Sequence, residues 1–148
     1  MPFRWVKGRT TSRWLPRTAS VVFTAGDLVI MTSGLLATAL ATTSTTVVGI
    51  IRKAVASTDS DYATAAVRVL VEVPLDDNCV LEGPVANGSL LTTSLGVKFG
   101  LTSAGAVDFA DTTTTVLMCV GFLSAALGHF MIEPDALWKG RKDSYGGA

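Results

Sequence analysis

The sequence contains one histidine and two cysteines, and this scarcity restricts the chemistry available to the chain. Cys79 and Cys119 lie 40 residues apart and form no CxxC motif, so neither a zinc site nor a disulfide framework is indicated. We expect both to be buried free thiols, because unpaired cysteine packs as a small hydrophobic residue. His129 has no second histidine with which to share a metal or a triad, so we predict a structural role for it.

Catalytic groupings are missing as well. Serine and threonine are plentiful, but a hydroxyl becomes a nucleophile only beside a base such as histidine or lysine. The sequence presents no such arrangement. We therefore predict that the protein is not an enzyme and that it uses no metal ion and no cofactor.

The sequence also lacks uninterrupted apolar segments of membrane-spanning length. Residues 28–51 carry no charge and could cross a bilayer in principle, but ten of these 24 residues are Ser, Thr or Gly. A membrane protein would also need residues 116–132 to be helical. The first apolar run follows a region containing Trp5, Trp14 and Pro16, so no secretory leader is expected. We predict synthesis in the cytosol and no membrane contact.

The composition instead favours strands, because Thr, Val, Ala and Gly are abundant while Lys and Glu are few. Residues 67–73 place valine at every second position, as expected for a half-buried strand. Residues 28–31, 47–51 and 112–123 are further candidate strands, and residues 89–95 could form one or two helical turns. We predict an all-β domain at residues 20–132, a small β-barrel or β-sandwich with at most one short helix. Residues 133–148 form a tail whose Trp138 docks on the body.

The charges are distributed unevenly along the chain. Five basic residues precede the first acid, Asp27, although the whole sequence has no net charge. We interpret residues 1–19 as an extended N-terminal arm, because they show no clear periodicity and mix basic with aromatic residues. A disordered tail or nucleic-acid binding would be alternatives, but the two tryptophans favour a partner protein. The candidate binding residues are Phe3, Arg4, Trp5, Lys7, Arg9, Arg13, Trp14 and Arg17.

Four short motifs carry a resemblance to a known family. They are G-D-x-V at residues 26–29, V-G-I at 48–50, A-G-x-V-D at 104–108 and V-G-F at 120–122. Their order resembles that of the decoration, or cement, proteins of tailed-phage capsids. The resemblance covers residues 26–122.

The resemblance implies a small β-barrel or β-sandwich protein that sits on the outside of a mature capsid and stabilises the shell. It implies the major capsid protein as partner, a homotrimer or else a dimer, and a location on the outer virion surface after synthesis in the host cytoplasm. Another β-rich virion component, such as a tail tube or head-completion protein, is the alternative, followed by a small membrane protein. No nucleic-acid partner is expected.

Overall fold

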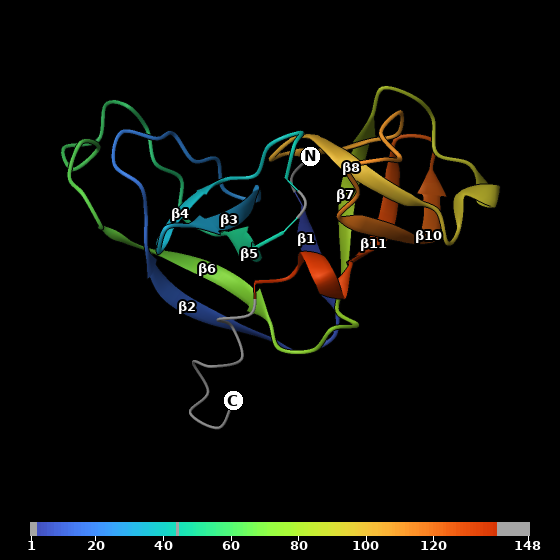
Figure 1. The fold of residues 1–148 in the computed structure, drawn as a ribbon, viewed down its shortest axis with the longest axis horizontal. Coiled ribbons are helices and arrows are strands. Elements are labelled where there is room, and N and C mark those ends of the chain that lie inside the picture. Colours follow the sequence, from blue (N-terminus) through green and yellow to red (C-terminus); the bar gives the residue numbers. More distant parts are fainter. Residues whose placement is uncertain (1–2, 44, 139–148) are drawn as a thin grey trace.

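The computed structural model describes residues 3–43 and 45–138, which form eleven β-strands in two sheets (Figure 1). The all-β fold predicted from the sequence is confirmed. In chain order the strands are β1 (Arg4–Lys7), β2 (Thr10–Pro16), β3 (Leu28–Thr32), β4 (Leu35–Thr38), β5 (Val47–Ile51), β6 (Arg68–Pro74), β7 (Val80–Ala86), β8 (Lys98–Ser103), β9 (Ala106–Asp108), β10 (Leu117–Ser124) and β11 (Leu127–Ile132).

Five strands form a closed barrel in the order β7-β11-β10-β8-β9. The ring closes where Val85 and Ala86 of β7 pair in parallel with Val107 and Asp108 of β9, whereas its other strand pairs are antiparallel. β1 pairs with the first half of β7, beside β9 on the same edge. Closure satisfies the backbone groups that an open edge would expose.

The other five strands form a sheet in the order β2-β6-β5-β3-β4, on the left of Figure 1. Val69, Val71 and Val73 of β6 are buried, which confirms the valine face predicted from their alternation, whereas Val67 lies just before the strand and is only half-buried. All five residues of β5 are buried, because this strand is covered on both faces.

Two hydrophobic clusters hold the sheets together. The first combines Leu28 and Ile50 of the open sheet with Leu81 and Phe130 of the barrel, so the two sheets share one core. The second lies on the other face of the open sheet and buries the β6 valines against Phe23 and its neighbours in the loops. The barrel and the open sheet therefore pack as one body.

The prediction of a separate N-terminal arm at residues 1–19 is wrong for its described part. β1 extends the barrel sheet, and β2 pairs with β6 along seven residues, from Thr10 to Pro16. Gly8, between the two strands, has φ of 95° and makes the turn that separates them. The exposed charges along β1 and β2 made these strands difficult to predict from the sequence. Charged residues are, however, typical of strands at the edge of a sheet.

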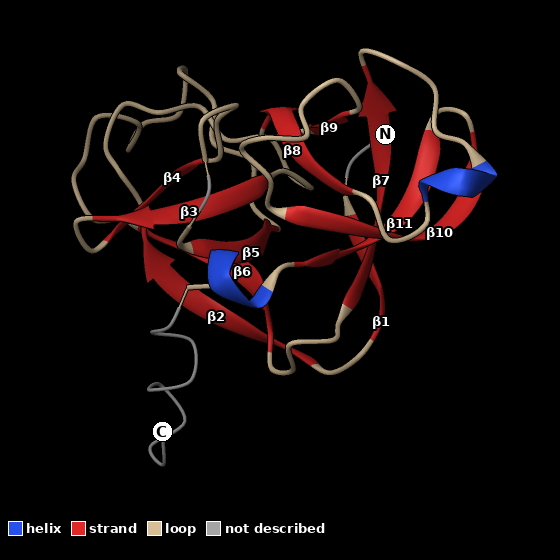
Figure 2. Cartoon of the chain, turned by 45° about the vertical axis from the view of Figure 1, so that its right-hand side comes forward, coloured by secondary structure: helices blue, strands red, loops and turns tan. Residues whose placement is uncertain are grey.

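Two short 3-10 turns, Thr92–Ser94 and Pro134–Ala136, are the only helical segments among the described residues (Figure 2). The first falls within the helical region predicted at residues 89–95, and the second exceeds the one short helix expected. Ala136 and Leu137 are buried, and the backbone N–H of Trp138 donates to the carbonyl of Val47. Trp138 thus docks on the body as predicted, while residues 139–148 of the expected tail lie outside the described residues.

No helix within residues 3–43 and 45–138 is long and apolar enough to cross a membrane. Residues 28–51 contain β3, β4 and β5, and residues 116–132 contain β10 and β11. The two membrane helices that the alternative required are therefore absent from these segments.

Candidate functional site

The structure divides the eight predicted binding residues into two groups. Half of them point into the body and half toward solvent, because neighbouring residues on a strand face opposite sides. The inward group is Phe3, Trp5, Arg13 and Arg17, and the outward group is Arg4, Lys7, Arg9 and Trp14.

Phe3 and Trp5 connect the N-terminal strand to both sheets. Phe3 is 2% exposed and its ring packs over Gly83, where an added Cβ atom would collide with two ring carbons. The indole Nε1 of Trp5 donates to the carbonyl oxygen of Glu72 in β6, at 3.1 Å. Phe3 is thus enclosed in the body, and the prediction that it contacts a capsid directly is wrong, whereas binding by the partly buried Trp5 stays a prediction.

Arg17 fastens a loop to the open sheet. Its side chain is 1% exposed, and the guanidinium donates to the carbonyl oxygens of Thr18, Asp61 and Tyr62 at 3.3, 2.8 and 3.3 Å. The Asp61 carboxylate lies 3.4 Å from Nη2 of the same guanidinium. A side chain that is this deeply buried cannot contact a partner protein, so the predicted binding role of Arg17 is wrong.

Arg13 also lies on the inward side, opposite Val71 of β6. Its guanidinium carbon lies 5.4 Å from the centre of the Trp138 ring, within the range of a cation–π contact. Arg13 therefore holds the end of the described chain against β2.

The outward group remains available to a partner. Trp14 is 60% exposed on β2, and Lys7 is exposed at the end of β1 without an ion-pair partner among residues 3–43 and 45–138. Arg4 and Arg9 form ion pairs with Glu82 and Asp76 but remain largely exposed. Binding by these four residues stays a prediction.

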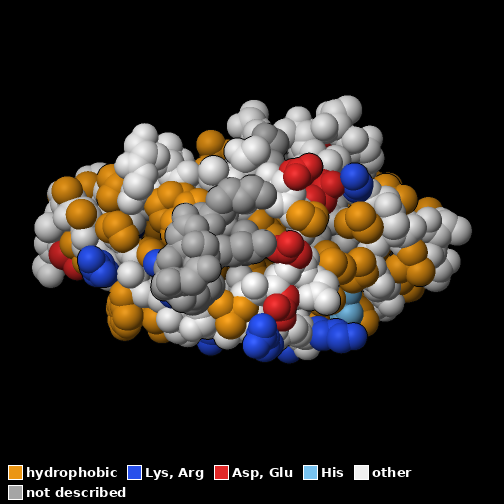
Figure 3. Space-filling view, turned by 60° about the horizontal axis from the view of Figure 1, so that its bottom comes forward, with side chains coloured by type: hydrophobic (Ala, Val, Ile, Leu, Met, Phe, Trp, Pro, Cys, Tyr) orange, Lys and Arg blue, Asp and Glu red, His pale blue; other side chains and the backbone are white. Residues whose placement is uncertain are grey.

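The clearest candidate site is the outer surface of the barrel formed by β1, β7, β11 and β10, which we call the barrel face. It has a hollow of about 390 Å³ lined by Val6, Lys7, Val80, Val120, His129 and Met131. Figure 3 shows hydrophobic side chains over the barrel half of the molecule beside the histidine, with Lys and Arg side chains along the margin below. The barrel face therefore combines an apolar centre with charged surroundings.

Two β-bulges flank this hollow. On β1, Trp5 pairs with Leu81 and Lys7 pairs with Val80, so β1 has one extra residue between the two pairs. On β10, Cys119 pairs with Phe130 and Gly121 pairs with His129, which again leaves one extra residue. The extra residues are Val6 and Val120, which are 36% and 38% exposed. Because a bulge redirects side chains, both valines reach the hollow instead of the core.

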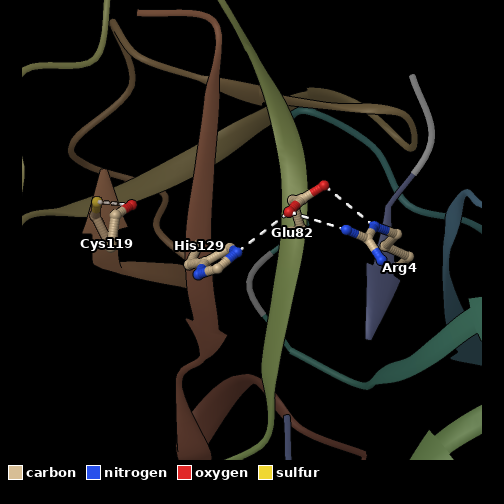
Figure 4. A network of polar contacts seen from close by, with 5 residues as sticks. Arg4, Glu82, Cys119 and His129 are labelled. Atoms are coloured by element: carbon tan, nitrogen blue, oxygen red, sulfur yellow. Dashed lines mark hydrogen bonds and ion pairs between the residues drawn. The ribbon is translucent and has the colours of Figure 1, made fainter. Parts of the chain in front are cut away.

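A polar network lies on the barrel face and reaches the hollow at His129 (Figure 4). Glu82 on β7 stands between Arg4 on β1 and His129 on β11. Arg4 donates through Nε and Nη2 at 3.1 and 3.3 Å, and Nε2 of His129 lies 3.2 Å from Oε1 of Glu82. Gly121 makes room for the histidine, since a Cβ there would lie 3.0 Å from the Cβ of His129. The network ties three adjacent strands together.

The environment of Glu82 keeps this carboxylate charged. The hydrogen bond from Arg4 lowers the pKa of Glu82 below its ordinary value, and His129 adds to this effect, while burial opposes it. An ionised Glu82 occupied by two neighbours orients the His129 ring at the edge of the hollow. These contacts fix the positions of three neighbouring side chains on the barrel face.

The two cysteines are buried and free, as predicted. Burial raises the pKa of both thiols, which disfavours the reactive thiolate form. The described part of the chain contains no group of three or more His, Cys, Asp or Glu side chains that could hold a metal ion.

The sequence analysis did not single out Val80, Glu82, Val120 or Met131 as site residues. Val120 lies in the strand predicted at residues 112–123, but Met131 lies in β11, which was not predicted, and the hollow depends on which strands are neighbours and on the two bulges. The nearest local signal was glycine beside an exposed β-branched residue at Val120-Gly121, because an isolated glycine in a strand often marks a bulge.

Comparison with known proteins adds no relative. No protein-family model matches the chain, and searches of curated proteins and of solved structures return no match.

Proposed function

We propose that this protein is a structural virion component that binds the outside of a tailed-phage capsid and stabilises the shell without catalysing a reaction. The barrel face carries the proposal, because an exposed apolar hollow on a protein surface is typical of a protein-binding site. The resemblance of residues 26–122 to capsid decoration proteins supplies the identity of the partner, the major capsid protein.

The rigidity of the barrel suits this role. A flexible arm of twenty residues would lose about 1 to 2 kcal/mol of backbone entropy per residue when it became ordered on a shell. The barrel face is already held by strand pairing and by the Arg4–Glu82–His129 network, so binding orders little further structure. We therefore expect the folded body, and not an N-terminal arm, to bind the shell.

We further propose a homotrimer on the shell, with a dimer as the alternative, located on the outer virion surface after synthesis in the host cytoplasm. Neither nucleic acid nor a membrane is the proposed partner. Native mass measurement of the protein, free and after release from particles, tests the assembly. A monomer in both settings would contradict it.

A tail tube or head-completion protein is the second candidate, because both are β-rich virion components. Cryo-electron microscopy of particles that copurify with the protein separates the two. We expect density that fits the barrel and the open sheet on the outer face of the capsid lattice. Density along the tail or at the portal would favour the second candidate, and the absence of any copurifying particle would overturn both.

A further inference from the structure

The ion pairs bordering the barrel face share an asymmetry. In each of them the cation is more exposed than the carboxylate. The side-chain exposures are 64% and 10% for Arg4 and Glu82, 78% and 35% for Arg9 and Asp76, and 53% and 16% for Lys98 and Glu133.

This asymmetry determines which charge a partner meets first. Two of the acids also have a second partner, since Nε2 of His129 lies 3.2 Å from Oε1 of Glu82 and Thr115 Oγ1 donates to Glu133 at 2.9 Å. Lys7 adds an exposed ammonium group that has no ion-pair partner in the described part of the chain. Away from the barrel face the pattern is mixed, because Arg52 and Glu72 are 57% and 23% exposed whereas Arg17 is buried and Asp61 is 52% exposed.

The cations also flank the hollow on two sides. Arg4 and Lys7 lie on β1, and Arg9 follows directly after it. Lys98 lies on β8 opposite Met118 of β10, beyond the other side of the hollow. An apolar centre between exposed cations is complementary to a partner that presents an apolar side chain between carboxylates.

We propose that the barrel face binds an acidic protein surface, which inserts an aliphatic side chain into the hollow while its carboxylates meet Lys7 and Arg4. This inference rests on the proposed function, since the acidic surface is assigned to the outer capsid shell. Val6, Val80, Val120 and Met131 supply the apolar contact that retains the partner. The exposed cations accelerate encounter and select the sign of the partner, and salt weakens their contribution.

The chemistry of the barrel face can be tested without any capsid. The full-length ¹⁵N-labelled protein is titrated with the synthetic peptide acetyl-Glu-Leu-Asp-Leu-Glu-amide and separately with acetyl-Lys-Leu-Lys-Leu-Lys-amide. We expect the acidic peptide to shift the amide resonances of Val6, Val120 and Met131, and the basic peptide to leave them unchanged. Equal shifts with both peptides, shifts confined to other surfaces, or no shifts would overturn the inference.

Shell binding then tests the same residues in the proposed setting. The probe is the particle that copurifies with the protein, stripped of it and mixed with purified parent or variant. Lys7→Glu should weaken binding about fivefold at low salt and less at high salt, because a rim charge acts through screened attraction. Val120→Asp should weaken it about thirtyfold or more at either salt concentration, because it places a charge in the apolar centre.

Matched substitutions elsewhere provide the controls. Lys53→Glu makes the same charge change at an exposed position after β5, and Leu40→Asp makes a similar polar change at a side chain that is 56% exposed. Both should bind shells like the parent, and all four variants should show parental thermal unfolding. Parental binding by Lys7→Glu and Val120→Asp would overturn the inference while the proposed function stood. Peptide shifts on the barrel face without shell binding by the parent would overturn the proposed function and leave the acidic-partner chemistry intact.

Discussion

The barrel and the open sheet each contain five strands, but they close in different ways. Backbone pairing between β7 and β9 completes the barrel. In the open sheet, β2 and β4 meet through a single bridge between Arg17 and Leu36, and the buried Arg17 side chain fastens the loop beside them. The barrel is thus closed by a strand pair, whereas the open sheet has one isolated bridge at this edge and a buried arginine that holds a neighbouring loop.

The first prediction tests the core of the open sheet. Val69 is 3% exposed within the second cluster, so Val69→Asp would bury a carboxylate without a partner. We expect the free energy of unfolding to fall by about 4 kcal/mol or more, which is enough to prevent soluble folding. The measurement is soluble yield and thermal unfolding, with Arg68→Glu at the exposed neighbouring position as control. If Val69→Asp melted like the parent, the assigned register of β6 would be incorrect.

The second prediction concerns the contact that joins the N-terminus to the barrel. Gly83→Ala would place a methyl group against the ring of Phe3. We expect this overpacking to lower the free energy of unfolding by about 2 to 3 kcal/mol. Urea unfolding of Gly83→Ala, Phe3→Leu and the double variant forms a cycle. The double variant should lose less than the sum of the two single losses, because the smaller side chain relieves the collision. Additive losses would indicate that the two residues do not touch.

The third prediction concerns the loop that Arg17 holds against the open sheet. Arg17→Met removes the donors to three carbonyl oxygens while keeping much of the apolar volume. We expect the free energy of unfolding to fall by about 2 kcal/mol and amide hydrogen exchange to become faster at residues 58–66, while the exchange rates in the barrel stay unchanged. Arg17→Lys should fall between this variant and the parent, because one ammonium group cannot reach all three acceptors. Exchange that accelerated equally in the barrel would contradict the local role of Arg17.

The smallest expected effect concerns pH and the barrel face. The folded-state pKa of Glu82 is lowered, chiefly by Arg4, so the resulting stability is present above the unfolded pKa of about 4.3 and is lost as pH falls through the folded-state value. Because Arg4 is largely exposed, the contribution is no more than about 1 kcal/mol.

Urea unfolding of the parent and of Glu82→Gln at pH 7 and pH 3 measures this contribution. The variant should lose less stability on acidification than the parent. Asp76→Asn, in the more exposed pair with Arg9, is the control and should behave like the parent. An equal acid loss in Glu82→Gln and the parent would show that Glu82 does not contribute through its charge.

Local patterns predicted several strands because they depend on neighbouring residues. The alternation of Val69, Val71 and Val73 identified β6, and the β-forming residues at 28–31 and 47–51 identified β3 and β5. The same reasoning failed at the N-terminus. Arg4 and Lys7 suggested a solvated arm, yet Phe3 and Trp5 between and beside them have their partners at Gly83 and Glu72, about 70 to 80 positions away.

The sequence by itself determined the class of structure and the scarcity of reactive groups. Spacing along the chain and the number of each residue type are sufficient for both, as with the single His129 and the two buried cysteines. Only the tertiary structure decided where the barrel closes, and it alone placed Val6 and Val120 at one hollow and left each rim cation more exposed than its carboxylate. Those features arise from pairing between distant strands and from a one-residue change of register, which no local pattern encodes.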